Sequence, residues 1–404
     1  MLVFYNIAIW LYSLGVFLAS FFNPKAKLWL NGRKDILDKI ENEVEPFSGE
    51  TIWVHCASLG EFEMARPIME GVKNSGSNSR IILTFFSPSG YEIRKNDDLA
   101  DYVFYLPLDT KSNALRFVNA IKPSKTIFVK YDFWFHHLNE AKKSGSELML
   151  ISAQFRANQS CFKWYGAVTR RALKLFDQIF LVDSNSEKLL NNIDVKNTTV
   201  CGDTRYDRVM EIAKTAQSIP EIESFKGAEK LIVCGSTWPE DERLLVEAIQ
   251  TLPNVKWVIA PHEVGEGNIK RLERLFPNSV RLSALSNREV KVVLVDSIGQ
   301  LNRLYNYAGV AYVGGAFKTG LHNILEATAY GVPTIFGPYY SRFPDAGEMA
   351  EKELAFSVSN QSELNDKLRG LLGQDQVTLK KGILDFMKSR TGATTAILQY
   401  TNKC

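Results

Sequence analysis

The 404-residue sequence lacks the patterns that would assign it to several common classes of protein. It carries little excess charge, because 48 basic and 45 acidic residues leave a net charge of +3. A nucleic-acid-binding protein needs a larger basic excess, so we expect no nucleic-acid partner. The five cysteines are scattered and form no Cys-x-x-Cys pair. Neither a zinc site nor a disulfide framework is expected, and reduced thiols in the cytoplasm fit best.

Two nucleotide-binding signatures are also missing. The sequence has no Gly-x-Gly-x-x-Gly fingerprint, which argues against NAD or FAD. It has no Gly-x-x-x-x-Gly-Lys-[Ser/Thr] loop either, so ATP hydrolysis is not expected.

Residues 1–22 lack charge altogether and consist mainly of Leu, Ile, Val, Phe, Trp and Tyr. A helix of this length would be about 33 Å long, enough to cross the hydrocarbon core of a bilayer. Lys25, Lys27, Arg33 and Lys34 follow at once, which places the rest of the chain in the cytoplasm by the positive-inside tendency. We therefore expect a membrane anchor over residues 1–22, which either spans the membrane or lies on it. A helix buried in the protein is the alternative.

Short apolar runs then alternate with helical stretches. Strands are expected over residues 51–56, 80–85, 102–106, 126–129, 148–152 and 178–182, and again over 231–234, 257–260, 292–295, 310–313 and 334–336. Such runs are typical of parallel sheets covered by helices on both faces. The alternation pauses between Tyr206 and Glu229, which predicts two doubly wound α/β domains facing a cleft, residues 23–210 and 211–404. A final helix over about residues 376–400 could cross back to the first domain.

The strand expected over residues 310–313 ends in paired glycines. Gly314 and Gly315 would let a ligand approach the backbone. A helix expected from His322 onward would offer free N–H groups to a phosphate, with His322 and Asn323 as further donors. Glu326 has the acceptor chemistry to hold a ribose diol. Each residue alone fits an ordinary Rossmann-like turn, but the ordered set favours a nucleotide-sugar site.

In the first half, the strand over residues 51–56 leads through Ser58 and Gly60 to Glu61 and a helix. This order places Glu61 at the C-terminal edge of the sheet, where a carboxylate could take the proton of an attacking sugar hydroxyl. Acidic residues are also common in the first turn of a helix, and spacing alone favours that structural role.

Together these segments resemble the Kdo transferase family, whose members add 3-deoxy-D-manno-oct-2-ulosonic acid (Kdo) to a lipid A precursor. The resemblance covers nearly the whole chain and rests on several motifs in the same order. These are Ser58 to Glu61, Phe85 to Gly90, Tyr105 to Asp109, Gly235 to Trp238, Asp296 to Leu301, and Gly314 to Pro338.

The resemblance implies a GT-B fold, an inverting mechanism, and no metal or other cofactor. It implies CMP-Kdo as the donor and lipid IVA, a membrane-embedded lipid A precursor, as the acceptor in lipopolysaccharide core biosynthesis. Residues 23–210 would bind the acceptor and residues 211–404 the CMP-sugar. The enzyme would sit at the bacterial inner membrane through one N-terminal anchor, with its catalytic body in the cytoplasm.

The resemblance also implies roles for particular residues. Glu61 matches the catalytic base of the family, which reverses the conclusion from spacing, and Asp132 stands for a second acid. The expected donor-binding residues are Ser236, Thr237, His262, Ser297, Gly299, Gly314, Gly315, His322, Asn323 and Glu326. The expected acceptor- or carboxylate-binding residues are Ser58, Gly60, Lys130 and Arg156.

Two segments depart from the pattern of the family. Lys130 stands where many members have the first acid of Glu-Thr-Glu, and Pro261-His262 lacks the arginine of Pro-Arg-His. The alternative enzyme is a GT-B transferase or epimerase that uses a UDP-sugar, although such enzymes lack the Ser-Leu-Gly-Glu element. A membrane-anchored binding protein without activity is a further alternative, against which Glu61 and Glu326 speak. The sequence predicts neither the oligomeric state nor the number of Kdo units added.

Overall fold

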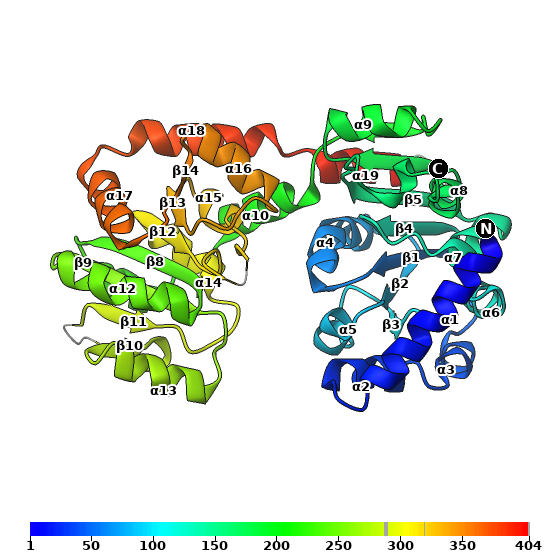
Figure 1. The fold of residues 1–404 in the computed structure, drawn as a ribbon, viewed down its shortest axis with the longest axis horizontal. Coiled ribbons are helices and arrows are strands. Elements are labelled where there is room, and N and C mark those ends of the chain that lie inside the picture. The colour runs from blue at the N-terminus through cyan, green and yellow to red at the C-terminus, as the bar shows by residue number, and fades with distance from the viewer. Residues whose placement is uncertain (287–289, 319, 403–404) are drawn as a thin grey trace. The chain divides into compact units, whose positions relative to one another are not determined.

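A computed structural model describes residues 1–286, 290–318 and 320–402. The chain divides by its internal contacts into two compact units (Figure 1). Unit 1 comprises residues 1–208 together with the chain from Thr391 onward, and unit 2 comprises Val209–Arg390. The boundary falls inside α10 (Thr204–Thr215).

Unit 1 is built on a seven-stranded parallel sheet in the order β3-β2-β1-β4-β5-β6-β7. Its strands are β1 (Glu50–Cys56), β2 (Ser79–Phe85), β3 (Tyr102–Tyr105), β4 (Lys125–Val129), β5 (Glu147–Ala153), β6 (Gln178–Leu181) and β7 (Thr198–Val200). The chain winds outward from β1 in both directions, so the switch point of the sheet lies between β1 and β4.

Helices cover both faces of this sheet, because successive side chains of each strand point to opposite faces. Trp53 of β1 joins one buried core, whereas its neighbours Ile52 and Val54 join the other. The helices are α1 (Leu2–Ala19), α2 (Pro24–Asn31), α3 (Ile36–Glu43), α4 (Leu59–Asn74), α5 (Pro88–Arg94), α6 (Lys111–Ile121), α7 (Phe135–Lys143), the 3-10 turn η1 (Ser160–Phe162), α8 (Ala167–Leu173), α9 (Ser184–Asn191) and α19 (Ala393–Thr401).

Unit 2 has a second seven-stranded parallel sheet, in the order β10-β11-β9-β8-β12-β13-β14, with its switch point between β8 and β12. The strands are β8 (Lys230–Thr237), β9 (Val255–Pro261), β10 (Ser279–Arg281), β11 (Val292–Leu294), β12 (Val310–Val313), β13 (Thr334–Phe336) and β14 (Ala355–Ser357). The helices are α11 (Pro220–Lys226), α12 (Pro239–Thr251), α13 (Glu266–Leu275), η2 (Leu282–Ala284), α14 (Leu301–Leu304), η3 (Tyr305–Tyr307), α15 (Leu325–Thr328), α16 (Pro344–Glu351), α17 (Gln361–Gly373) and α18 (Val377–Ser389).

The two doubly wound units confirm the fold class expected from the sequence, and every expected strand is present. The sequence did not predict β7, β10 and β14, which have three residues each and lie at edges of the sheets. An edge strand is covered less completely than a central one, so its residues lack the continuous apolar signal.

The single helix expected over residues 376–400 is wrong. The structure has α18 in unit 2 and α19 in unit 1, separated by Gly392, whose φ of 115° is a conformation that L-residues rarely adopt. The helix α19 packs against α4, where the lack of a side chain on Gly71 makes room for Leu398. Lys125 Nζ donates a 2.7 Å hydrogen bond to the carbonyl of Thr401. The end of the chain is thus part of unit 1.

The N-terminal helix α1 lies along the outside of unit 1 from α7 to α2 (Figure 1). Tyr5 donates a short hydrogen bond to Asp109 and accepts one from the N–H of Phe135 at 3.3 Å. Asn6 bonds to His136 at 2.7 Å, and Ile9 is buried. The outward side of α1 exposes large apolar side chains: Val3, Phe4, Ile7, Trp10, Leu11, Leu14, Phe17 and Leu18. Among the described residues, α1 is the one helix long and apolar enough to cross a membrane.

Candidate active site

Glu61 lies in the first turn of α4, just beyond the C-terminal end of β1. Its carboxylate accepts a short hydrogen bond from the N–H of Ala57. Burial raises the pKa of Glu61 to about 7, and the negative charge of Asp132 adds to the rise, whereas the Ala57 bond and Lys130 lower the pKa. A carboxyl group with a pKa near 7 suits a general base that works at neutral pH.

Asp132 follows β4 and is held by a line of buried polar groups. Trp53 donates to the hydroxyl of Thr84 at 2.8 Å, and this hydroxyl lies 2.9 Å from Nδ1 of His55. Nε2 of His55 lies 3.1 Å from the Asp132 carboxylate, which also accepts from the indole N–H of Trp134 at 3.2 Å. Two donors therefore fix the Asp132 carboxylate beside Glu61.

The protonation state of His55 follows from its surroundings. Burial lowers the pKa of His55, although its bond to Asp132 opposes this effect, so the imidazole is neutral at pH 7. An ionised carboxylate can only accept, so Nε2 carries the proton and Nδ1 accepts from Thr84. Sequence analysis missed both residues. The available signal was a histidine and a threonine inside otherwise apolar strands.

Of the other residues expected in unit 1, Ser58, Gly60 and Lys130 lie at the switch point between β1 and β4, whereas Arg156 follows β5. Lys130 has a φ of 60° and donates its N–H to the carbonyl of Ile151 at 3.0 Å, so the chain turns sharply after β4. Ser58 precedes α4 as its N-cap, and Gly60 is exposed. Arg156 is exposed after β5, where its charge lowers the otherwise raised pKa of Tyr131. The structure thus brings Glu61 together with Asp132 and Lys130 and places Ser58 and Gly60 beside it.

Asp109, the last residue of the Tyr-Leu-Pro-Leu-Asp motif, has a structural role. One carboxylate oxygen accepts from the N–H and Nδ1 of His137, and the other accepts from the N–H of His136 and from Tyr5. Burial would raise the pKa of Asp109, but the His137 bonds lower it overall. Asp109 therefore fixes the start of α7, directly after the loop that carries Asp132, and connects it to α1.

In unit 2, the C-terminal end of β8 touches the glycine turn after β12. Gly314 donates its N–H to the carbonyl of Gly235 at 2.9 Å. A Cβ at Gly314 would lie 2.5 Å from the carbonyl oxygen of Ser236, so only glycine fits. Ser236 has a φ of 53° and Gly315 a φ of 92°, so the chain bends sharply at both residues. Ser236, Thr237, Gly314 and Gly315 are thus brought together, and their role in binding the donor stays a prediction.

Asp241 and Glu242, which sequence analysis missed, hold these loops in place. Buried Asp241 accepts hydrogen bonds from the N–H of Gly315 at 2.9 Å, the N–H of Trp238 at 2.9 Å and the hydroxyl of Tyr312 at 2.7 Å. Glu242 accepts from Thr237 and from Arg271. The available signal was Trp-Pro-Glu-Asp, which places Asp241 at the third position of a helix, where an acid can complete a capping box.

A stack of three rings lies beside this turn. The ring centroids of Trp238 and His262 are 4.7 Å apart, and those of His262 and His322 are 4.6 Å apart. Trp238 donates its indole N–H to Nε2 of His322 at 2.8 Å. Burial lowers the pKa of His322 to about 4, and nearby His262 contributes. His322 is therefore neutral at pH 7, and its proton is on Nδ1.

The sequence predicted a helix that begins at His322, and this prediction is wrong. α15 begins at Leu325 and has only four residues, so His322 and Asn323 precede it. Asn323 accepts from the N–H of Leu325 at 3.1 Å and donates to Glu326 at 3.2 Å. So short a helix has little dipole, which removes the helix dipole as an argument for a phosphate site at this position.

Two further expectations concern Glu326 and the loop after β11. The charge of Glu326 contributes to the raised pKa values of Tyr305 and Tyr330, which places Glu326 near both rings. Ser297 and Gly299 are exposed on a loop whose Asp296 bonds to Ser283. The hydrogen bonds found for this loop among the described residues therefore connect it to η2, and none of them connects it to the glycine turn.

The chain has two doubly wound units, each with polar residues gathered at the switch point of its sheet. This is the architecture of the GT-B class, which confirms the expected fold. A similar solved structure is UDP-GlcNAc 2-epimerase from Neisseria meningitidis bound to UDP-GlcNAc, with a TM-score of 0.60 and 15% identity over 88% of this chain and 100% of that chain. This likeness concerns the fold alone.

The family is shown by sequence comparison. A family model described as 3-Deoxy-D-manno-octulosonic-acid transferase (kdotransferase) matches residues 31–208. The chain is 30% identical over 347 residues to the 3-deoxy-D-manno-octulosonic acid transferase of Aquifex aeolicus, which covers 84% of this chain and 89% of the relative. It is 28% identical over 354 residues to that of Chlamydia trachomatis serovar A, covering 83% and 81%. The chain belongs to the Kdo transferase family, which confirms the resemblance predicted from the motifs.

Proposed function

We propose that this protein is an inverting glycosyltransferase that moves Kdo from CMP-Kdo to lipid IVA. The observation that carries the proposal is Glu61, a carboxyl group with a pKa of about 7 at the switch point of unit 1 in a chain of this family. A base with this pKa is largely ionised just above neutral pH yet basic enough to take a hydroxyl proton during attack.

The chemistry assigned to Glu61 is a single displacement. The acceptor hydroxyl oxygen forms a bond to the anomeric carbon of Kdo while the bond from that carbon to the phosphate oxygen of CMP breaks. Glu61 takes the hydroxyl proton, and the bonding electrons leave with CMP. Attack opposite the leaving group inverts the anomeric configuration. Burial keeps the pKa of Glu61 high and the charge of Asp132 adds to the rise, while Lys130 supplies positive charge beside it.

The donor is assigned to unit 2. The Ser236 hydroxyl and the Nδ1–H of His322 are neutral donors beside the glycine turn, and we assign them to the single phosphate of CMP. Gly315 N–H bonds to Asp241 and so supports the turn. Glu326 is assigned to the ribose of the donor. The donor-binding and acceptor-binding roles of the two units, and of the residues named for them, are part of this proposal.

We also propose that α1 holds the enzyme at the cytoplasmic face of the inner membrane and lies on the membrane, not across it. Tyr5 and Asn6 bond to unit 1 on one side of the helix, whereas Val3 and Phe4 are exposed on another. In cells with an intact inner membrane, a membrane-impermeant maleimide added from outside should not label Val3→Cys. Labelling of that cysteine before the membrane is dissolved would instead show a spanning helix.

The donor and acceptor are tested by turnover. The purified protein is incubated with lipid IVA and either CMP-Kdo or UDP-GlcNAc. The proposal expects CMP release and a modified acceptor with CMP-Kdo only. Turnover with UDP-GlcNAc only would support the UDP-sugar alternative. Binding of CMP-Kdo without turnover would support a binding protein.

A further inference from the structure

An apolar groove runs between α1, α2 and the turn that leads from β2 into α5. It has a volume of about 540 Å³, within the range of small-molecule sites. Its walls are Tyr12, Gly15, Val16 and Ala19 of α1, Lys25, Ala26 and Trp29 of α2, and Phe86, Ser87 and Pro88 of the turn. Lys25 is the one charged residue among them, and it is exposed.

The floor of the groove is a fixed aromatic cluster. The ring centroids of Tyr12, Trp29 and Phe86 are 5.7 to 5.9 Å from one another. The guanidinium of Arg33 lies 3.9 Å from the centroid of Trp29 and donates to the carbonyls of Leu106 and Phe86. Burial lowers the pKa of Arg33 to about 9, which leaves it charged at neutral pH, and these contacts hold the floor in place.

The groove adjoins the candidate catalytic residues. The ring of Phe86 stacks on that of Trp134 at 4.6 Å, and Trp134 donates to Asp132 at 3.2 Å. The N–H of Ser87 donates to the carbonyl of Ala57 at 2.8 Å, and the N–H of Ala57 donates to Glu61. One wall of the groove is therefore bonded to the segment that holds the proposed base.

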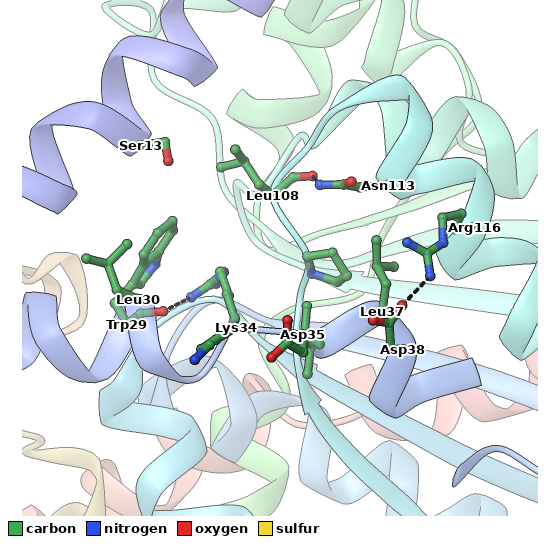
Figure 2. A pocket seen from close by; sticks show the side chains of 13 residues that line it. Ser13, Trp29, Leu30, Lys34, Asp35, Leu37, Asp38, Leu108, Asn113 and Arg116 are labelled. Carbon is green, nitrogen blue, oxygen red and sulfur yellow. Dashed lines mark hydrogen bonds and ion pairs between the residues drawn. The ribbon is translucent and has the colours of Figure 1, made fainter. Parts of the chain in front are cut away.

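A second pocket that also touches Trp29 has a different character. Figure 2 shows charged side chains around this second cavity of about 400 Å³, including Lys34, Asp35 and the ion pair between Asp38 and Arg116. Burying an alkyl chain against these groups would cost their hydration. An apolar ligand is thus favoured in the first groove and disfavoured in the second.

We propose that the first groove, here called the acyl groove, holds one acyl chain of the acceptor lipid. This inference rests on the proposed function and adds the site that reads the lipid part of the acceptor. The apolar walls suit an alkyl chain, because each methylene group buried there is removed from water. Lys25 at the rim complements a phosphate on the same lipid. The contacts of Phe86 and Ser87 with the segments that hold Asp132 and Glu61 then connect the bound acyl chain to the proposed base.

The test fills the groove without disturbing the protein. A side chain added at Gly15 meets no atom within 4 Å, so Gly15→Trp projects into open space. Leu14→Trp is the matched control, because it adds the same ring to the neighbouring exposed residue, which does not line the groove. Kdo transfer from CMP-Kdo is measured for lipid IVA and for its fully deacylated disaccharide, both in detergent.

For lipid IVA, we expect Gly15→Trp to lower kcat/KM about tenfold, equivalent to ~1.4 kcal/mol, and Leu14→Trp to change it less than about twofold. For the deacylated acceptor, both variants should match the wild type. Equal losses in the two variants, or an equal loss with both acceptors in Gly15→Trp, would overturn the proposal.

A second measurement does not depend on turnover. Lipid IVA with a photoreactive diazirine in an acyl chain should label the residues Val16, Ala19 or Ala26, located by fragmentation of the labelled peptides, and Gly15→Trp should abolish this labelling. Labelling confined to Leu14 and Phe17, or equal labelling by a diazirine phospholipid, would contradict the acceptor as the occupant. If neither the wild type nor the variants transfer Kdo, the proposed function fails. The labelling still shows whether the acyl groove holds an acyl chain of lipid IVA.

Discussion

Nε2 of His55 lies 3.1 Å from Oδ2 of Asp132, which connects the interior of the first sheet to the candidate catalytic carboxylates. Because His55 is buried and neutral, it fixes the position of Asp132 without cancelling its charge. That charge helps to hold the pKa of Glu61 near 7. We therefore assign the proton transfer to Glu61, whose basicity depends on the charge of Asp132 and on the position that His55 gives this carboxylate.

The first prediction concerns the pH dependence of transfer. Since Glu61 acts in its ionised form, kcat/KM should rise with pH and level off above about pH 7. Asp132→Asn removes a negative charge that raises the pKa of Glu61, so the rising limb should move to lower pH in this variant. Identical pH profiles for the wild type and Asp132→Asn would show that the charge of Asp132 does not raise the pKa of the base.

The second prediction concerns Glu61→Gln. Removing a general base typically costs about 10²–10⁴-fold in rate, and a drop in kcat of this size is expected. Glu63→Gln on the same helix, whose carboxylate pairs with Arg94, is the control and should retain most activity. A Glu61→Gln enzyme with more than about a tenth of the wild-type rate would rule out the assignment.

The same variant should also change the stability of the protein. The pKa of Glu61 is raised in the folded state, from 4.5 to about 7, so folding disfavours the ionised form. The wild type should therefore lose stability relative to Glu61→Gln as the pH rises through this window, with the full difference above pH 7. Thermal unfolding at pH 5 and pH 8 measures this effect. A gap in Tm that is the same at both values would contradict the raised pKa.

The fourth prediction concerns the glycine turn after β12, which we assign to the donor. Asp241→Asn cannot accept all three hydrogen bonds from Gly315, Trp238 and Tyr312, so the turn should loosen. We expect a raised KM for CMP-Kdo, an unchanged KM for the acceptor, and a loss of stability of about 1–3 kcal/mol. A raised KM for the acceptor alone would place Asp241 outside the donor site.

The fifth prediction concerns the attachment of α1. Tyr5→Phe removes the hydroxyl that bonds to Asp109 and to Phe135. The N–H of Phe135 then loses this acceptor and Asp109 loses one of its four donors, which should lower the stability of the protein by about 1–3 kcal/mol. Tyr12→Phe, whose half-exposed ring stays in the floor of the acyl groove, should have a smaller effect on Tm. Equal changes in Tm would show that the Tyr5 hydroxyl does not hold α1 in place.

The sequence predicted the central strands because their signal is local: β1 and β4 are almost entirely buried and carry runs of apolar residues. The role of Glu61 was predicted from the family resemblance of its short motif, because spacing alone favoured a structural role, and it stays a prediction. The roles of His55 and Asp241 were not predicted, because they depend on partners far along the chain. The partner of His55 is Asp132, and that of Asp241 is Gly315. No spacing rule connects such pairs before the sheet brings them together.

The predicted start of a helix at His322 was wrong for a related reason. The residues around His322 fit a helical pattern. In the structure, however, the N–H of His322 donates to the carbonyl of Gly314 at 3.2 Å, and the N–H of Gly320 donates to the carbonyl of Gly315 at 2.8 Å. These contacts with the glycine turn compete with the first turn of a helix. These contacts therefore decided the local structure at the proposed donor site, where His322 accepts the Trp238 indole N–H.

The most direct test of the central claim combines product and base in one experiment. Wild-type protein and Glu61→Gln are incubated with CMP-Kdo and lipid IVA above pH 7, and the lipid is analysed by mass spectrometry while released CMP is quantified. The account predicts that wild-type protein yields lipid IVA carrying Kdo and one CMP for each Kdo added, and that Glu61→Gln yields almost none. Unmodified lipid IVA with the wild type, or equal product from both proteins, would contradict it.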